Sequence, residues 1–203
     1  MTNKIIGIQG DKLDKINISS DTSIFLAHEA QKLGYKIFYY TPSNLSIIKN
    51  KTYANGVFVK FNYERKKFYK IYKKQKINVE NLKFILIRQD PPFNSEYLIT
   101  TLILDGLKKV KVINNPTAIR NVSEKLYSKH FIKFMPNTLF SNNMEEIKKF
   151  YKQNKSMTMK PINGYGGNQI HLIKNKFNKK LISNFLNKNG HSMFQKFLKN
   201  ISK

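Results

Sequence analysis

A lysine followed by closely spaced glycines is the segment whose residue types are best suited to chemistry. The run reads Lys-Pro-Ile-Asn-Gly-Tyr-Gly-Gly and occupies residues 160–167. Glycines let backbone N–H groups approach phosphate oxygens closely, and a lysine supplies a positive charge beside them. The run matches neither the Walker A pattern nor the dinucleotide-binding glycine pattern. Taken alone, it is better explained as a turn between two strands, where glycine supplies positive φ.

A second segment, 87–93, reads Ile-Arg-Gln-Asp-Pro-Pro-Phe and combines an arginine, an aspartate and a proline pair. It follows a predicted strand, and ligands in α/β folds commonly bind at the carboxyl ends of strands. Arg88 can hold a carboxylate through two hydrogen bonds. The proline pair stiffens the loop and can include a cis bond. An Arg88–Asp90 ion pair that braces a rigid turn accounts for the segment equally well.

The remaining polar residues indicate no further catalytic centre. The four histidines, His28, His130, His171 and His191, lack metal-ligand spacing. The sequence has no evident Ser-His-Asp arrangement and no cluster of carboxylates suited to Mg²⁺. Lys125 lies at a predicted helix start, and in a lysine-rich chain it carries little information by itself.

The elements that would position these segments begin with a strand, a helix and a second strand. Ile5–Gln9 is apolar enough for a buried strand, and 36–40 alternates as a second one. Between them, Asp21 is a suitable N-cap for a helix over 22–33, which Gly34 would end. This order predicts a parallel sheet. The rest of this region is expected to contain strands at 84–87 and 110–113, helices at 96–107 and from Pro116 towards 122, and a hairpin around Asn55-Gly56.

A second unit is expected to begin near Ser123. Its predicted helices span 125–131, 144–151 and 181–186, and its predicted strands span 138–140, 157–160, 170–173 and 193–197. The glycine run therefore lies between two strands. The fold class is α/β, with one domain over 1–122 and another over 123–203.

The composition is that of a globular protein with an unusual charge. It includes 40% hydrophobic residues, no cysteine and no apolar run long enough to cross a bilayer, which favours a cytoplasmic protein. The net charge of +25 is typical of a nucleic-acid surface, and the densest basic stretch, 65–76, also contains aromatic residues. However, Arg65, Arg88 and Arg120 are the only arginines among 37 basic residues. This imbalance favours codon bias in an AT-rich genome over a surface selected for nucleic acid.

Taken together and in order, these segments resemble prokaryotic glutathione synthetase, a ligase of the ATP-grasp fold. The opening strand and the helix from Asp21 resemble the N-terminal domain of that family, and 88–93 matches its Arg-x-Asp-Pro-Pro-Phe signature. The residues from Asn115-Pro116 to Glu124-Lys125-Leu126 match its Asn-x-Pro…Leu-Arg…Glu-Lys-Leu linker. The run at 160–167 resembles Lys-Pro-Leu-Asp-Gly-x-Gly-Gly. Four ordered matches across the chain are far more specific than any one of them.

The resemblance implies an ATP-dependent ligase that joins γ-glutamylcysteine to glycine through an acyl phosphate and releases ADP and phosphate. It also implies a substrate-binding (pre-ATP-grasp) domain over 1–122 and the first α+β part of an ATP-grasp domain over 123–203. ATP would be used with Mg²⁺, and family members commonly form oligomers. By the same resemblance, ATP would contact Lys125, Lys160, Gly164, Gly166, Gly167 and Gln195, and the dipeptide would contact Arg88 and Asp90.

Two departures from the family pattern limit these expectations. Asn163 stands where the family usually has aspartate, which removes a charge near the glycine run. The chain ends at Lys203, before the second ATP-grasp subdomain, so the family's metal ligands are not expected among these residues. We therefore expect a truncated or split synthetase, completed by a separate C-terminal chain or by a homo-oligomer, or else an inactive remnant. A basic nucleic-acid-binding protein is the alternative from another class.

Overall fold

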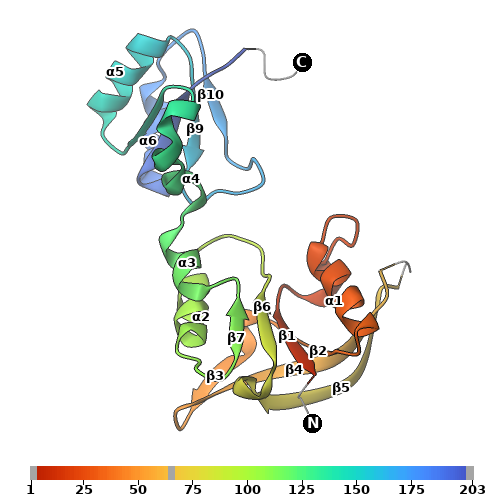
Figure 1. Ribbon diagram of the computed structural model, residues 1–203. Helices are drawn as coiled ribbons and strands as arrows, with labels where there is room; N and C mark the ends of the chain where they lie inside the picture. Colours follow the sequence, from red (N-terminus) through yellow and green to blue (C-terminus); the bar gives the residue numbers. More distant parts are fainter. Residues whose placement is uncertain (1–3, 64–66, 200–203) are drawn as a thin grey trace. The chain divides into compact units, whose positions relative to one another are not determined.

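The computed structural model describes residues 4–63 and 67–199, which belong to two compact units (Figure 1). The first unit is Met1–Asn121 and the second is Val122–Lys203. Each unit has its own sheet and its own buried apolar core, as separate domains do.

Four parallel strands lie side by side in the sheet of the first unit, in the order β2–β1–β6–β7. Helix α1 connects β1 to β2, and helix α2 lies between β6 and β7. The predicted parallel sheet is therefore confirmed for these strands. They are β1 (Ile5–Gln9), β2 (Lys36–Tyr40), β6 (Phe84–Ile87) and β7 (Lys111–Ile113).

In the described residues, three antiparallel strands extend this sheet beyond β2. They are β3 (Leu45–Ile48), β4 (Lys51–Phe61) and β5 (Tyr69–Asn78), and β4 pairs with β2, β3 and β5. The predicted hairpin around Asn55-Gly56 is wrong, because β4 runs straight through both residues. The chain reverses instead at Lys49 and Asn50, whose φ values of 46° and 60° suit a two-residue hairpin turn.

Gly56 is required inside β4 by its neighbours on β2. A Cβ atom on Gly56 would lie 2.5 Å from Cζ of Phe38 and 2.6 Å from the backbone oxygen of Tyr39. Phe38 is fully buried and also packs against Phe58, with ring centroids 5.3 Å apart. The Asn-Gly pair therefore marks a close approach between strands rather than a turn.

Most of the lysine-rich stretch noted in the sequence forms β5. Arg65 lies outside the described residues, and within them β5 pairs only with β4. Residues 70–76 of this strand are exposed. Lysines on an edge strand oppose edge-to-edge pairing with another chain. This placement gives the charge a structural role that does not require nucleic acid.

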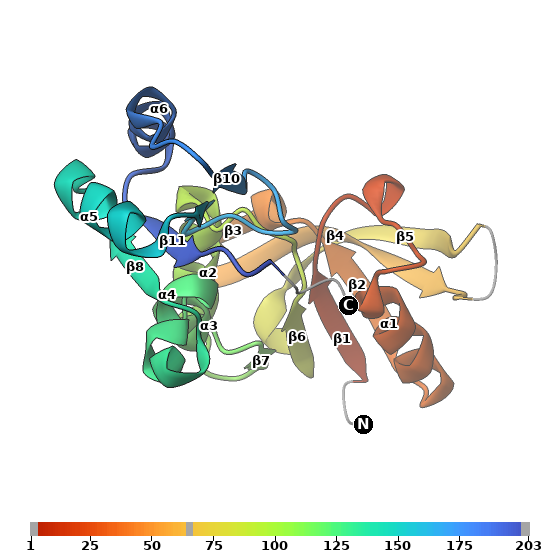
Figure 2. The ribbon, with the colours of Figure 1, turned by 90° about the horizontal axis from the view of Figure 1, so that it is seen from above.

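Helices cover both faces of the first sheet (Figure 2). α1 (Thr22–Lys32) covers one face, and α2 (Ser95–Asp105) with α3 (Pro116–Asn121) covers the other. α1 begins as predicted at Asp21, whose carboxylate accepts hydrogen bonds from backbone N–H groups of the first turn. Asn94 caps α2 in the same way. The described part of the unit also contains the short 3-10 helices Leu13–Lys15, Pro42–Asn44 and Val79–Asn81.

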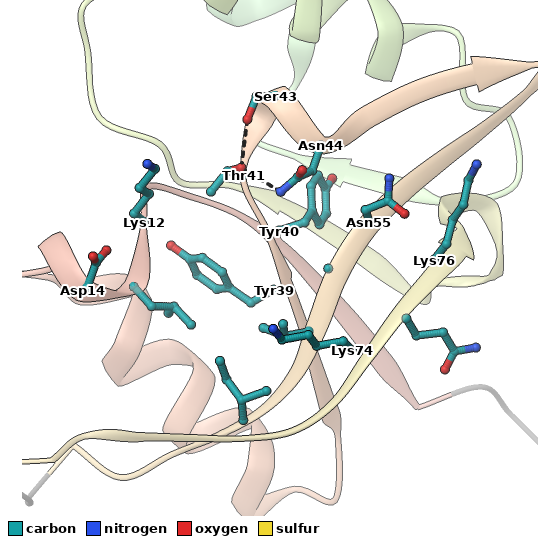
Figure 3. A pocket seen from close by; sticks show the side chains of 15 residues that line it. Lys12, Asp14, Tyr39, Tyr40, Thr41, Ser43, Asn44, Asn55, Lys74 and Lys76 are labelled. Carbon is teal, nitrogen blue, oxygen red and sulfur yellow. Dashed lines mark hydrogen bonds between the residues drawn. The ribbon is translucent and has the colours of Figure 1, made fainter.

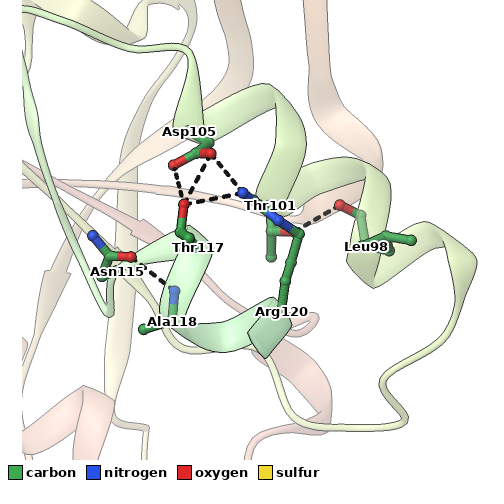
Figure 4. A network of polar contacts seen from close by, with 7 residues as sticks. All are labelled: Leu98, Thr101, Asp105, Asn115, Thr117, Ala118 and Arg120. Carbon is green, nitrogen blue, oxygen red and sulfur yellow. Dashed lines mark hydrogen bonds and ion pairs between the residues drawn. The ribbon is translucent and has the colours of Figure 1, made fainter. Parts of the chain in front are cut away.

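A polar network joins α2 to α3 (Figure 4). Arg120 donates a hydrogen bond of 2.5 Å to Asp105, and the Thr117 hydroxyl donates to the two carboxylate oxygens at 2.9 and 3.0 Å. The hydrogen bond from Arg120, followed by that from Thr117, holds the pKa of Asp105 below its usual value. Asn115 accepts from the backbone N–H of Ala118 at 2.8 Å and so caps the start of α3. The linker motif therefore has a structural role here.

Replacement of Tyr40 by phenylalanine is expected to stabilise the protein. The Tyr40 side chain is 1% exposed, and its hydroxyl group has no hydrogen-bond partner among the described residues. An unpaired buried polar group is costly, so Tyr40→Phe should raise the free energy of unfolding by about 1 kcal/mol in urea titrations. Tyr39→Phe is the matched control, because the Tyr39 hydroxyl donates to the backbone oxygen of Asp11 at 2.6 Å. This control should lower the free energy of unfolding, and equal effects of the two variants would contradict the prediction.

The second unit is built on an antiparallel sheet in the order β10–β9–β11–β8. α5 (Met144–Asn154) and α6 (Lys179–Asn189) pack on one face and contribute to a single apolar core. Asn143 and Asn178 cap their starts. The strands are β8 (Thr138–Ser141), β9 (Met157–Pro161), β10 (His171–Ile173) and β11 (Ser192–Lys196).

The helical segment at the start of this unit is less regular than predicted. α4 covers only Glu124–Tyr127 and is followed by a 3-10 segment, Ser128–Phe134. Phe131 breaks the helix expected over 125–131, because its φ is −116°. Throughout residues 4–63 and 67–199, the helices are too short or too polar to cross a membrane.

Candidate functional site

The face of the second sheet that is turned away from α5 and α6 carries a line of polar side chains. Along β9, residues 157, 159 and 161 are buried, so Thr158 and Lys160 point to the opposite face. Gln195 on β11 lies directly opposite Thr158 in the antiparallel register and shares that face. Two residues predicted as site residues, Lys160 and Gln195, are thus brought together.

Hydrogen bonds fix the orientation of both side chains. The Lys160 ammonium donates to Oε1 of Gln195 at 2.9 Å, and Nε2 of Gln195 donates to the Thr138 hydroxyl at 3.0 Å. That hydroxyl donates in turn to the backbone oxygen of Pro136 at 2.6 Å. Thr138 was not predicted as part of the site, because only the pairing of β8 with β11 places it opposite Gln195.

The glycine run forms the connection between β9 and β10, residues 162–170. The interpretation as a loop between paired strands is therefore correct, although this connection is longer than the two-residue turn of a tight hairpin. Gly166 and Gly167 have φ values of 59° and 73°, which residues with a side chain rarely adopt. The Lys125 ammonium donates to the backbone oxygen of Gly164. Lys125 is thus held against the glycine loop.

The positive charges of Lys125 and Lys160 repel each other. Burial, followed by the charge of Lys125, lowers the pKa of Lys160. Glu124 lies 3.8 Å from the Lys125 ammonium and is largely exposed, and Lys160 has no carboxylate partner among the described residues. A pair of lysines beside an exposed glycine loop is suited to a ligand with several negative oxygens.

Arg88 and Asp90 lie in the first unit, at the carboxyl end of β6. Arg88 donates from Nε to the Ser23 hydroxyl at 2.9 Å and from Nη2 to the Thr22 hydroxyl at 2.6 Å. The alternative of an Arg88–Asp90 ion pair is wrong: within the described chain Arg88 forms no ion pair and is instead tied to the first turn of α1. The guanidinium group has five N–H donors, so several remain for a ligand.

Asp90 is linked to the end of β1 rather than to Arg88. Its backbone N–H donates to the Asp11 carboxylate at 2.8 Å. Burial, then the charges of Asp11 and Asp21, raise the pKa of Asp90, and Arg88 partly opposes them. The buried Gln9 side chain donates a hydrogen bond to the side chain of Gln89. This contact fixes Gln89, which lies between Arg88 and Asp90.

Sequence reasoning missed Asp11, Thr22 and Ser23. They follow β1 and begin α1, whereas Arg88 and Asp90 follow β6. Because β1 and β6 are parallel neighbours, their carboxyl ends meet at one edge of the sheet. The parallel order that was predicted correctly could have located these residues.

The described residues do not provide a metal site. They contain no group of three or more histidine, cysteine, aspartate or glutamate side chains arranged to hold an ion. Lys160, Lys125 and the glycine loop suit the phosphates of a nucleotide, but they offer no carboxylate ligand for Mg²⁺.

Comparison with known protein families covers nearly the whole chain. Residues 5–120 match the N-terminal domain of prokaryotic glutathione synthetase, and residues 124–203 match the ATP-grasp domain of the same enzyme. Glutathione synthetase of Wigglesworthia glossinidia brevipalpis is 34% identical over 97% of this chain, and that of Vibrio parahaemolyticus is 32% identical over 97%. The chain spans 63% and 64% of these relatives, which is less than two thirds of their length.

Solved structures share the fold at low sequence identity. D-alanyl-alanine synthetase A from Vibrio cholerae has a TM-score of 0.57 and 16% identity, with 98% of this chain and 60% of that chain covered. D-cycloserine synthetase DcsG has a TM-score of 0.60 and 10% identity, with 96% and 59% covered. Together with the match of residues 124–203 to an ATP-grasp domain, these likenesses confirm the ATP-grasp type of fold.

Proposed function

The chain belongs to the prokaryotic glutathione synthetase family, and on that premise we propose that its second unit binds the phosphates of ATP. Lys125 and Lys160 are the proposed phosphate ligands, and the loop residues Gly164, Gly166 and Gly167 are proposed to lie beside the phosphates. Gln195 orients Lys160 and is the proposed polar contact next to the nucleotide. The observation that carries this proposal is a pair of mutually repelling lysines next to one glycine loop. Lys125 donates to the backbone oxygen of Gly164 in that loop, and Lys160, at the end of the strand before it, has no acidic partner in the described chain.

The reaction that we propose is the joining of γ-glutamylcysteine to glycine in the cytoplasm, as part of glutathione synthesis. The γ-phosphoryl group of ATP would pass to the carboxylate of the dipeptide, which gives ADP and an acyl phosphate. The glycine amine would then attack the acyl carbon and form the amide bond, and inorganic phosphate would leave. Lys125 and Lys160 would stabilise negative charge on the phosphoryl oxygens during the first step.

We propose that the carboxyl edge of the first sheet holds the dipeptide. Arg88 would bind a carboxylate, because its guanidinium plane is fixed by the Thr22 and Ser23 hydroxyls and retains free N–H donors. Asp90 and Asp11 carry negative charge suited to a substrate ammonium group. Mg²⁺ normally accompanies phosphoryl transfer, but the described residues do not fit it, so none of them is given a step through a metal.

Thermal unfolding of the 203-residue chain with and without ATP tests the proposal directly. A ligand that binds only the folded state raises the melting temperature, and ATP should do so in a saturable way. γ-Glutamylcysteine should produce a separate increase through the first unit, and Arg88→Ala should abolish that increase alone. The proposal fails if neither compound shifts unfolding at millimolar concentration.

The pH dependence of ATP binding should report the lowered pKa of Lys160. Phosphate binding needs the charged ammonium, so affinity is retained below the pKa of Lys160 in the free protein and falls as pH rises through it. This decline should begin below the ordinary lysine pKa of about 10.4. Dissociation constants measured from about pH 7 to pH 10 should show it, and Lys160→Arg should move it upward because arginine stays charged. A decline that is unchanged in the arginine variant would contradict the assignment to Lys160.

A further inference from the structure

A cavity of about 740 Å³ lies in the first unit, outside the residues proposed for ATP and the dipeptide (Figure 3). It is bounded by the 3-10 helix after β1, the end of β2, the middle of β4 and the facing part of β5. Its volume falls within the range of small-molecule sites, about 300–1,000 Å³.

Part of the lining of this cavity is apolar. Leu13, Tyr39, Val57 and Ile71 line it, and the Tyr39 ring is held in place because its hydroxyl donates to Asp11. Figure 3 shows Lys12 on one side of that ring and Lys74 on the other. An apolar lining with a few polar groups is the usual composition of a site for a small organic molecule.

Two lysines at the rim have no neutralising partner. In the described part of the chain, neither Lys12 nor Lys74 forms an ion pair. The Lys76 ammonium lies 5.2 Å from the centroid of the Tyr53 ring. Asp14 is the one acidic residue among those that line the cavity. The cavity therefore carries an excess of positive charge, which favours an anion.

Asn55 adds a hydrogen-bonding group to the cavity from the middle of β4, although asparagine is uncommon in strands. Its side chain makes no hydrogen bond with described residues and lines the cavity. It lies opposite Lys76 and two residues before Val57, which is opposite Lys74. β4 and β5 thus present an amide, an ammonium and an apolar side chain to the same space.

We propose that this cavity binds a small organic anion, in which an apolar body rests on Tyr39, Val57 and Ile71. Lys12 and Lys74 bind its carboxylate or phosphate group, and the Asn55 amide donates a further hydrogen bond. The proposal does not depend on the ATP site, so the two can fail separately.

Nuclear magnetic resonance titrations of the ¹⁵N-labelled 203-residue chain test this site with four matched probes. Phenyl phosphate and phenylacetate carry an anion on an apolar body, inorganic phosphate is the anion alone, and benzyl alcohol is the neutral body. At least one of the first two should shift the amide signals of Asn44, Asn55 and Gln75 in a saturable way. Whichever of phenyl phosphate and phenylacetate binds more tightly shows whether the site prefers a phosphate or a carboxylate group. Inorganic phosphate and benzyl alcohol should each bind at least about tenfold more weakly.

Lys74→Gln and Lys73→Gln form a matched pair of variants. Both remove one positive charge from β5, but Lys73 lies opposite Phe58, which belongs to the core on the other face of the sheet. Lys74→Gln should weaken binding of the preferred probe about tenfold, because it removes a charge-assisted hydrogen bond. Lys73→Gln should leave the affinity within about twofold.

Any one of four results would overturn the proposal. Inorganic phosphate that binds as tightly as the organic anions would show an adventitious ion only. Benzyl alcohol that binds equally well would show an apolar patch without anion recognition. Equal weakening by the two lysine variants, or the absence of any saturable shift, would show attraction to the general basic surface and no built site.

Discussion

Replacing Lys160 with methionine is expected to weaken ATP binding about ten- to hundredfold. A hydrogen bond to a charged group contributes about 1.5–3 kcal/mol, and the Lys160 ammonium is already partly desolvated by burial, which lowers its pKa. Binding can be measured by competition against a fluorescent ATP analogue. Lys125→Met should have a similar effect, because the Lys125 ammonium is held on the same glycine loop.

The control for Lys160→Met is Lys148→Met. Lys148 is exposed on α5, which packs on the opposite face of the same sheet, so this variant changes the charge of the unit equally. It should leave ATP affinity within about twofold. Lys160→Met should also unfold no earlier than the unaltered chain, because it removes a charge that burial disfavours. Equal loss of affinity in both variants would remove Lys160 from the phosphate site.

Replacing Gly56 with alanine is expected to destabilise the first unit by about 1–3 kcal/mol or more, as overpacking of a filled core does. The new methyl group would lie 2.5 Å from Cζ of Phe38 and 2.6 Å from the backbone oxygen of Tyr39. A side chain can rotate away, but the backbone of β2 is held by pairing with both β1 and β4. The free energy of unfolding, measured in urea, should therefore fall.

Gly106→Ala is the matched control for this prediction. Gly106 follows α2 with φ of −74°, and the nearest atom to a Cβ there is the backbone oxygen of Ile103 at 3.8 Å. Alanine fits that conformation and should change stability by less than about 1 kcal/mol, with a gain expected from the lower entropy of the unfolded chain. A Gly56→Ala variant as stable as Gly106→Ala would show that β2 and β4 can separate at little cost.

The sequence allowed the regular elements to be predicted wherever local patterns agree with the final packing. The apolar strands at 5–9, 36–40 and 84–87 were found, and so was the helix after Asp21, because its cap is local. β5 was missed because its central residues are exposed and show no apolar alternation. A register shift between Phe58 and Val59 disrupts the pattern further.

The candidate sites were predicted less completely than the fold. Lys160 and Gln195 were named, and the structure joins them by a hydrogen bond across 35 residues of sequence. Thr138 and the hydroxyls that hold Arg88 were not named, because they become neighbours only through strand pairing. Asn55-Gly56 misled the prediction for a physical reason: glycine was needed for the close approach of Phe38, which no local rule can show.

The asparagine caps bear on the interpretation of the charge as codon bias. Asn94, Asn143 and Asn178 each accept hydrogen bonds at the start of a helix, a position where asparagine and aspartate serve about equally well. Mutational drift towards asparagine codons can therefore remove acidic side chains at helix starts and leave the hydrogen bonds in place. In an AT-rich genome, part of the net charge of +25 would then be a by-product of drift at helix starts, without selection for the charge itself.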